Sequence, residues 1–386
     1  MEGDSTMKVA IIGMGVVGRG AYEIIRDELA PDIQVKYVMD LRELDDVDCI
    51  VTKDIEQIVT DPEVDLVFES IGGLHPAYEF VTASLKAGKS VVTANKYLIS
   101  KYYKDLHKIA RENSACLEFT PSAGGGIPWL YNLDRTRRCG EIHTISGIIN
   151  GTTNFILDRM TRTGEDFAEV LRQAQSFGYA EADPSADIDG LDVQRKCAIS
   201  INRAFDVIVS PDDIPTAGIR FITNTDIAAF RSAGKVCRLI CHGSMEGGKV
   251  NAFVEPTLFD ADSLEGSVHD NNNLITMTGN YVGRLSFYGQ GAGRYPTAHS
   301  IVEDIVDIYE GHTHPFSLSN EAEVDNTAVY HTYYVRGDDL SFIKDHVVST
   351  RGEGIVTGPI SVSEMHSLAQ ERIAAGDKLF FAALNE

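Results

Sequence analysis

The chain has 386 residues, 43% of them hydrophobic and 24% charged, which is typical of a globular protein with two or three domains. Its formal net charge of -23 argues against nucleic acid or an anionic membrane as a partner, since either would be repelled. The six cysteines form no CxxC pair, and we find neither an apolar run of membrane-spanning length nor a signal peptide, so we expect a cytoplasmic protein.

The first predicted element is a strand at residues 8–12, KVAII, which leads directly into a GxGxxG sequence and then a helical pattern. In a dinucleotide site the first glycine makes the tight turn, the second lets the backbone approach the pyrophosphate, and the third lets the helix pack on the strand. The spacing alone is a weak signal, but the strand and helix around it strengthen the prediction. The expected cofactor-binding turn consists of Gly13, Gly15, Val16, Val17 and Gly18.

A second apolar strand, residues 35–39, ends in Asp40. A carboxylate at this position accepts a hydrogen bond from the ribose 2′-hydroxyl of NAD, whereas Arg42, two residues later, could instead meet the 2′-phosphate of NADP. We favour NAD and leave NADP open.

Strands and helices then alternate. The pattern predicts a helix at 55–59, a strand within 65–70, a helix at 75–87 and a strand at 89–92. This alternation predicts an α/β fold with a doubly wound parallel sheet of the Rossmann type, which binds its ligand at the carboxyl ends of the strands. Gly72, Gly73, Thr93 and Lys96 should lie on that edge. A lysine is most often a solvated surface residue, but the position of Lys96 favours a functional role.

Three glycine-rich stretches follow. Gly124–Gly126, followed by Ile127 and Pro128, suit a hinge or a close approach to a ligand, and Asn150-Gly151 predicts a tight turn. Residues 289–308 begin as a glycine-rich loop and end as an amphipathic helix, which could return the chain to the first domain.

The segment from Gly178 to Lys196 concentrates acidic residues. It contains Glu181, Asp183, Asp187, Asp189 and Asp192, next to Arg195 and Lys196. Carboxylates this crowded lie either on a solvated loop or in a site that binds a cationic group, such as an ammonium or a catalytic lysine. If residues 191–200 are helical, Asp192 and Lys196 stand at i and i+4 on one face, where the commoner arrangement is an exposed ion pair of little energetic weight.

Several motifs, taken together, resemble those of homoserine dehydrogenases over roughly residues 7–315. They are GMGVVG, SIGG, VVTANK, GGGIP, NGTTN, GYAEADP with GLDVQRK, and GAGRYPTA. The resemblance implies a homodimeric enzyme that interconverts L-homoserine and L-aspartate 4-semialdehyde with NAD or NADP, in the aspartate pathway to threonine and methionine. It implies that Lys196, Asp192 and Lys96 serve the chemical step, that Glu181, Asp187, Tyr179, Gly151 and Thr152 surround the substrate, and that Thr93 and Gly291 lie beside the cofactor.

These roles agree with the chemistry of alcohol oxidation, which needs a base within hydrogen-bond reach of the hydroxyl. With no zinc motif in the sequence, Lys196 is the best candidate, and Asp192 would orient it. Desolvation would lower the pKa of the lysine and an anionic neighbour would raise it, so the sequence does not give the sign of the shift. Glu181 and Asp187 would hold the substrate ammonium.

Two rival functions remain open at this point. One is a related dehydrogenase of another small hydroxy-amino acid, because an acidic cluster recognises an ammonium without measuring the length of the substrate. The other is a nucleotide-sensing regulatory protein that keeps the fold without the chemistry, which Lys196 and Asp192 argue against.

The sequence departs from the family in one place. Homoserine dehydrogenases usually carry a glutamate before the GGGIP motif as a ligand for a monovalent cation, and this chain has Thr120-Pro121 there. A sodium ion held only by backbone carbonyls around Ala123 and Gly125 is therefore doubtful.

We expect three parts: a dinucleotide-binding domain at 1–120 completed by 290–315, a mixed α/β substrate and dimerisation domain at 121–289, and a small α+β unit at 316–386. In the last, residues 327–335 and 378–384 are predicted as strands, 339–347 and 362–376 as helices, and 354–358 as a poorer strand. This order resembles a shortened ACT-type domain. An effector site for an amino acid such as threonine and an oligomerisation element are both compatible with it.

Overall fold

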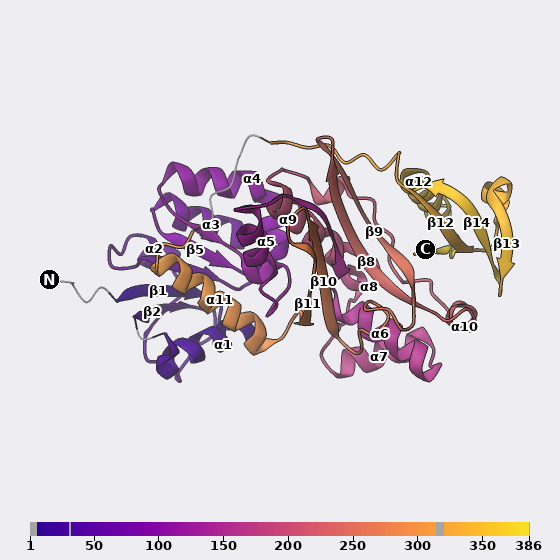
Figure 1. Cartoon of the computed structure of the whole chain (residues 1–386). Helices are drawn as coiled ribbons and strands as arrows, with labels where there is room; N and C mark the ends of the chain where they lie inside the picture. Colours follow the sequence, from indigo (N-terminus) through magenta and orange to yellow (C-terminus); the bar gives the residue numbers. More distant parts are fainter. Residues whose placement is uncertain (1–5, 31, 314–319, 386) are drawn as a thin grey trace. The chain divides into compact units, whose positions relative to one another are not determined.

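A computed structural model of the chain describes residues 6–30, 32–313 and 320–385 (Figure 1). The chain divides into two compact units, each built from three segments. The first unit comprises Met1–Arg138, Asn202–Ile208 and Gln290–Glu321, and the second comprises Cys139–Ile201, Val209–Gly289 and Ala322–Glu386.

The first unit contains a six-stranded parallel sheet in the order β3-β2-β1-β4-β5-β6. Its strands are β1 (Met7–Ile12), β2 (Ile33–Met39), β3 (Ile50–Thr52), β4 (Leu66–Glu69), β5 (Ser90–Thr93) and β6 (Leu117–Glu118). This strand order is that of dinucleotide-binding domains, and it confirms the predicted Rossmann fold. The order reverses beside β1, so the turn after β1 and the end of β4 meet at the switch point where such sheets bind ligands.

The helices of this unit pack on the sheet. They are α1 (Val16–Ile24), α2 (Ile55–Val59), α3 (Ala77–Lys86), α4 (Lys96–Glu112), α5 (Trp129–Arg137) and α11 (Arg294–Tyr309), with a π-helical turn η1 (Ile25–Leu29) and a 3₁₀ turn η2 (Thr120–Ser122). Helix α11 returns to this unit from far along the chain and lies against α1 (Figure 1). Its apolar face buries Ala298, Ile301 and Ile305 in the same core as Ile11 and Val38.

The second unit is built on a nine-stranded mixed sheet in the order β11-β10-β7-β8-β9-β15-β12-β14-β13. Its strands are β7 (Ile142–Ile148), β8 (Lys235–Glu246), β9 (Lys249–Asp260), β10 (Asn272–Gly279), β11 (Gly283–Gln290), β12 (Tyr330–Arg336), β13 (Val347–Arg351), β14 (Gly354–Ser361) and β15 (Phe380–Leu384). Its helices are α6 (Gly151–Thr163), α7 (Phe167–Ser176), α8 (Ser185–Ile188), α9 (Leu191–Phe205), α10 (Asn224–Ser232) and α12 (Val362–Ala374), with 3₁₀ turns η3 (Pro211–Asp213) and η4 (Ser341–His346). The last turn of α9, from Asn202, is grouped with the first unit.

The C-terminal strands differ from the expectation of a unit of their own. Strand β15 pairs in parallel with β9, so the tail extends the sheet of the second unit and Ala322–Glu386 is grouped with it. Its four strands lie in the order β15-β12-β14-β13 with antiparallel neighbours, the arrangement of a split β-α-β unit. The helix predicted at 339–347 is only the 3₁₀ turn η4. Residues 316–319 lie outside the described residues, and an ACT-like identity stays a prediction.

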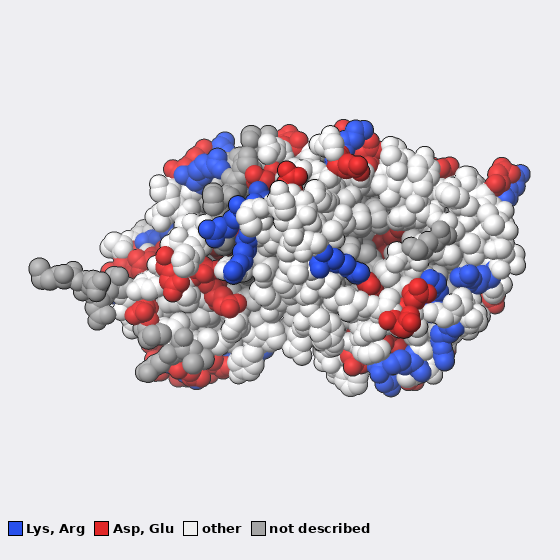
Figure 2. All heavy atoms as spheres, viewed as in Figure 1, with Lys and Arg blue, Asp and Glu red and all other residues white. Residues whose placement is uncertain are grey.

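No helix in the described part of the chain is long and apolar enough to cross a membrane. On the face drawn in Figure 2, lysine and arginine side chains are scattered among aspartate and glutamate rather than gathered into one continuous patch. This distribution gives no support to a polyanion as the partner of that face.

Candidate active site

The glycine turn after β1 has the geometry that its sequence predicts. Gly13 adopts φ 97°, and a Cβ atom at Gly18 would lie 2.0 Å from the carbonyl oxygen of Gly13, so both positions require glycine. At Gly15 a Cβ would meet nothing within 4 Å, and Val16, the first residue of α1, is 68% exposed. The backbone is therefore open to a ligand at the positive end of α1, as a pyrophosphate site requires.

Asp40 follows β2 and is held by its neighbours. Its carboxylate accepts hydrogen bonds from the backbone N–H of Met14 (2.8 Å) and from Nε (2.9 Å) and a terminal nitrogen (2.8 Å) of Arg42. These donors, the Arg42 side chain first among them, hold the pKa of Asp40 well below its usual value. The Arg42 side chain is itself 61% exposed, so a ribose hydroxyl and a 2′-phosphate would compete for one Asp40–Arg42 pair.

The other residues expected to bind the cofactor also lie in the first unit. Gly72 and Gly73 follow β4 and face open space, Thr93 ends β5 and is fully buried, and Lys96 is the first residue of α4. Gly291 lies against the glycine run, since a Cβ on Gly125 would come within 2.3 Å of its carbonyl oxygen. The strand-end loops are therefore brought together at one edge of the sheet, and Gly291 is brought to the Gly124–Gly126 turn.

The stretch considered for a cation is occupied by other contacts. The Thr120 backbone N–H and hydroxyl donate to the Asp304 carboxylate at 2.9 and 2.5 Å, and the Gly125 carbonyl accepts from the Ser300 hydroxyl at 2.8 Å. Burial, and then the nearby Glu118, raises the pKa of Asp304, which favours its uncharged form. A monovalent cation therefore fits poorly here, even though Ala123 and Gly125 still offer backbone oxygens.

The acid-rich segment of the sequence carries a buried ion pair in the second unit. Lys196 and Asp192 are 8% and 4% exposed, one turn apart on α9, and Lys196 Nζ lies 2.8 Å from Asp192 Oδ2. Lys196 also donates to the carbonyl oxygen of Ile149 at 2.8 Å. The pair is thus not the exposed i, i+4 pair that such spacing usually gives.

Asn150 connects this pair to Asp187 on α8, a link that the sequence pattern did not reveal. Its Nδ2 donates to Asp192 (2.8 Å) and to Asp187 (2.7 Å), and its Oδ1 accepts from the backbone N–H of Thr153 (2.8 Å). Asn150 is the N-cap of α6 rather than part of the predicted tight turn. Asparagine directly before a helical pattern is a capping signal, and it could have identified this residue.

The remaining substrate candidates surround the start of α6. Gly151 and Thr152 are its first two residues, and the Thr152 hydroxyl donates to the carbonyl of Tyr179 at 2.5 Å. The half-exposed Tyr179 ring lies edge-to-face with Phe155, at 5.3 Å between ring centroids, and Glu181 follows on the exposed loop. The structure therefore gathers Asp187, Asp192 and Lys196 closely, with Tyr179 beside Thr152, and leaves Glu181 at the surface.

Two acids of this segment have other partners. Asp189 forms a two-point ion pair with Arg220, both contacts at 2.6 Å, and Asp183 accepts from the backbone N–H of Ser185 at the start of α8. Asp183 and Asp189, for which no site role is predicted, thus bond to groups outside the Asp192–Lys196 pair.

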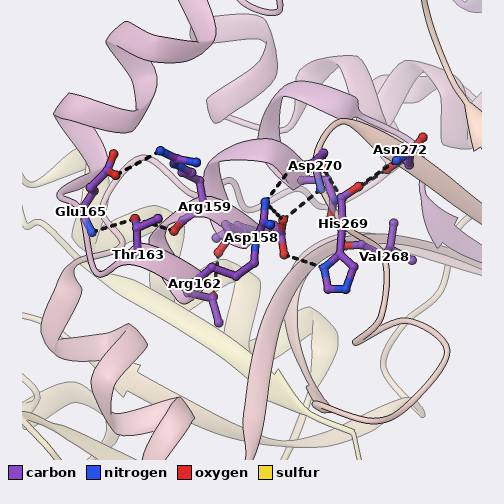
Figure 3. A network of polar contacts seen from close by, with 12 residues as sticks. Asp158, Arg159, Arg162, Thr163, Glu165, Val268, His269, Asp270 and Asn272 are labelled. Carbon is purple, nitrogen blue, oxygen red and sulfur yellow. Dashed lines mark hydrogen bonds and ion pairs between the residues drawn. The ribbon is translucent and has the colours of Figure 1, made fainter.

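A polar network anchors α6 farther along its length (Figure 3). Asp158, 2% exposed, accepts from His269 Nδ1 (3.0 Å) and from the backbone N–H of Asp270 (2.9 Å), and it pairs with Arg162 (2.9 Å). These bonds fix α6 to the loop before β10, and that loop approaches Gly151 so closely that a Cβ there would lie 2.6 Å from the Asn271 carbonyl. The network therefore holds the helix whose first residues belong to the substrate candidates.

Comparisons with known proteins agree with this geometry. Residues 128–306 match the family model described as homoserine dehydrogenase, and residues 13–120 match that of the homoserine dehydrogenase NAD binding domain. The chain is 39% identical over 318 residues to the homoserine dehydrogenase of Synechocystis, covering 78% of this chain and 73% of that one, and 37% identical over 314 residues to that of Bacillus subtilis, covering 78% and 72%. A crystal structure of a homoserine dehydrogenase from Thiobacillus denitrificans matches with a TM-score of 0.86 at 28% identity, over 98% of both chains. A chain with this fold and this similarity over most of its length belongs to the homoserine dehydrogenase family and is an oxidoreductase with a dinucleotide-binding domain.

Proposed function

We propose that Lys196 is the acid–base group in the interconversion of L-homoserine and L-aspartate 4-semialdehyde. The observation that carries this proposal is the buried position of the Lys196 ammonium. Two of its three N–H groups bond to Asp192 and to the Ile149 carbonyl. Among the described residues no third acceptor is recorded, so one N–H can point to a substrate oxygen.

The reaction needs two transfers, and the chain supplies one of them. When bound, the nicotinamide accepts or donates the hydride. In the oxidising direction the neutral Lys196 amine takes the proton of the substrate hydroxyl as the carbonyl double bond forms. In the reducing direction its ammonium returns a proton to the carbonyl oxygen, and Asp192 stabilises that charged form.

The polar groups of the amino acid are proposed to bind on either side of Asn150. Asp187 and Glu181 supply negative charge for the substrate ammonium. The first backbone amides of α6, at Gly151 and Thr152, favour its carboxylate, because the positive end of a helix attracts anions. The Tyr179 carbonyl accepts from the Thr152 hydroxyl, which holds Tyr179 beside the same helix start.

The cofactor is proposed to bind along the glycine turn and the strand ends of the first unit, with NAD preferred through Asp40. Lys96, at the start of α4, is proposed to assist the chemical step. We assign no role to a cation, because the Gly125 carbonyl already accepts from Ser300 and Asp304 is favoured in its neutral form.

We further propose a cytoplasmic homodimer. All six cysteines are described and free, as expected in a reducing compartment. The edge strand β11 exposes apolar side chains that a second copy would cover.

Substitution of Lys196 tests the central assignment. Lys196→Ala should lower kcat by about a thousandfold, the range of a lost general base, while the Kd of the dinucleotide stays unchanged. Lys196→Arg should be as slow, because a guanidinium keeps the charge but does not release its proton. Both are measured by reduced-nicotinamide absorbance with homoserine.

Lys249→Ala is the matched control, since this lysine lies in the same unit with a side chain 72% exposed. Its rate should equal that of the unaltered enzyme. Turnover within tenfold of normal in both Lys196 variants would remove Lys196 from the mechanism.

A further inference from the structure

Glu69 is a fully buried carboxylate at the end of β4, beside the proposed cofactor edge. Its Oε1 accepts from the backbone N–H groups of Ile71 (2.8 Å) and Gly72 (3.1 Å), and its Oε2 accepts from the hydroxyl of Thr93 (2.6 Å). One side chain therefore joins the loop after β4 to the loop after β5.

The bonds continue from Thr93 and close into a ring. Thr93 Oγ1 accepts from the backbone N–H of Asn95 (2.9 Å), and Asn95 Nδ2 donates to the carbonyl of Gly73 (2.7 Å), back on the first loop. Asn95 Oδ1 accepts from the backbone N–H of Leu98 (3.1 Å) and so caps α4, whose first residue is Lys96. The ring thus includes the amide of Gly72, the carbonyl of Gly73 and the N-cap of the helix that carries Lys96.

Burying this carboxylate is costly, and its surroundings show what compensates. Desolvation raises the pKa of Glu69, whereas the hydrogen bonds from Thr93, Gly72 and Ile71 oppose that rise. Among the described residues the recorded contacts of Glu69 include no lysine or arginine. The hydrogen bonds from Ile71, Gly72 and Thr93 all end on its two oxygens, so the site suits a side chain with two oxygen acceptors.

We propose that Glu69 is a positioning residue that sets the geometry of both strand-end loops, so that Gly72 and Gly73 meet the dinucleotide and the first turn of α4, which carries Lys96, is held in place. It acts through Thr93 and Asn95 and need not touch cofactor or substrate. The inference rests on the proposed cofactor edge and on the proposed role of Lys96.

Glu69→Gln tests this role, since it keeps the volume and replaces one acceptor by a donor. If the NH₂ group of the new glutamine side chain points toward Thr93, the Thr93 hydroxyl proton loses its acceptor. If the NH₂ group points the other way, it faces the backbone N–H of Gly72, and two donors oppose each other. We expect the KM for the dinucleotide to rise about tenfold and kcat to fall about tenfold, with the KM for homoserine changed less than twofold.

Val81→Ala is the matched control. Val81 is fully buried on α3 in the same unit, and its truncation lowers stability by leaving a cavity without changing the ring. This variant should show a lower Tm with unchanged kcat and KM. If Glu69→Gln behaves in the same way, Glu69 is only structural and the proposal is overturned.

A second variant guards against misfolding. Thr93→Val removes one donor and leaves the carboxylate in place, so it should reproduce part of the rise in dinucleotide KM. When Thr93→Val is combined with Glu69→Gln, the dinucleotide KM should rise little further, because both changes break the same ring of hydrogen bonds. Fully additive effects on the dinucleotide Kd would contradict the ring.

Lys96→Ala, assayed in parallel, separates this inference from the proposed function. Normal kinetics in that variant would disprove the role of Lys96. The effect of Glu69→Gln on the dinucleotide Kd would still test the role of Glu69. A normal dinucleotide Kd in both Glu69→Gln and Thr93→Val would instead disprove the role of Glu69 whatever Lys96 does.

Discussion

At the scale of single residues, the proposed chemistry depends on contacts between groups distant in sequence. Lys196 bonds to a carbonyl 47 positions earlier, and Asp192 to an amide 42 positions earlier. The i, i+4 spacing of Asp192 and Lys196 could be predicted from sequence, because helical periodicity is local. The burial of the pair could not, because it depends on how α9 packs in the second unit.

The Asp40–Arg42 pair leads to a prediction about cofactor preference. Arg42→Ala should lower kcat/KM with NADP at least tenfold, about the worth of one charged hydrogen bond to a phosphate, and leave kcat/KM with NAD within threefold. The released Asp40 can still accept from a ribose hydroxyl. The measurement is the initial rate with each dinucleotide in turn.

Asp40→Asn is the reciprocal variant, and it should impair NAD more than NADP, because the amide is a weaker acceptor than the carboxylate. Equal losses with both dinucleotides in both variants would show that this pair does not discriminate between them.

At the scale of elements, β11 is one of the two edge strands of the nine-stranded sheet. All eight of its residues are exposed or only partly buried, and Leu285 and Tyr288 are among the large exposed apolar side chains. An edge strand with such side chains is prone to pair with another chain. A two-fold axis beside β11 would pair it with its own copy, which is the commonest symmetry of homo-oligomers.

This arrangement predicts that Leu285→Lys weakens the proposed dimer at least tenfold, because a charge replaces an apolar contact at the edge and meets its own copy across the axis. The measurement is analytical ultracentrifugation over a range of concentrations. Leu264→Lys is the matched control, since Leu264 is exposed in the same unit but outside any strand. An unaltered enzyme that sediments as a monomer, or equal dimer affinity in both variants, would remove β11 as the interface.

At the scale of the whole molecule, the C-terminal tail is joined to the rest of its unit by more than one contact. Glu255 on β9, fully buried, accepts from His331 Nδ1 (2.8 Å) on β12 and contacts His366 Nε2 (3.0 Å) on α12. These two histidines, which oppose the effect of burial, keep the pKa of Glu255 below its ordinary value. The described residues from 322 onward therefore contribute to the core of the second unit.

Truncation after Pro315 should consequently destabilise the enzyme. It removes β15 from the edge of β9 and takes both histidine partners from Glu255, and each hydrogen bond lost from a charged group costs about 1.5–3 kcal/mol. We expect a large loss of Tm, measured by circular dichroism. Glu255→Gln should raise the Tm of the truncated chain and lower that of the full chain. An unchanged Tm on truncation would contradict this account.

Much of the first unit could be predicted from the sequence. The glycine spacing and the alternation of apolar runs report local geometry, which each segment carries in its own residues. The short strands β3 and β6 escaped prediction, because two or three residues are too few for a periodic signal. The tail was predicted as a separate unit because the sequence pattern of residues 378–384 indicates a strand but does not reveal that this strand, β15, pairs with β9.

The sequence alone was therefore enough to predict the family, the Rossmann turn and the candidate pair Asp192 and Lys196. The packed structure was needed to show that Asn150 joins Asp187 to Asp192, that Glu69 closes a ring between two loops, and that the tail lies in the sheet of the second unit. The difference is physical. Periodicity and turn chemistry act between neighbours in the chain, whereas these contacts form only when helices and strands distant in sequence bury their surfaces together.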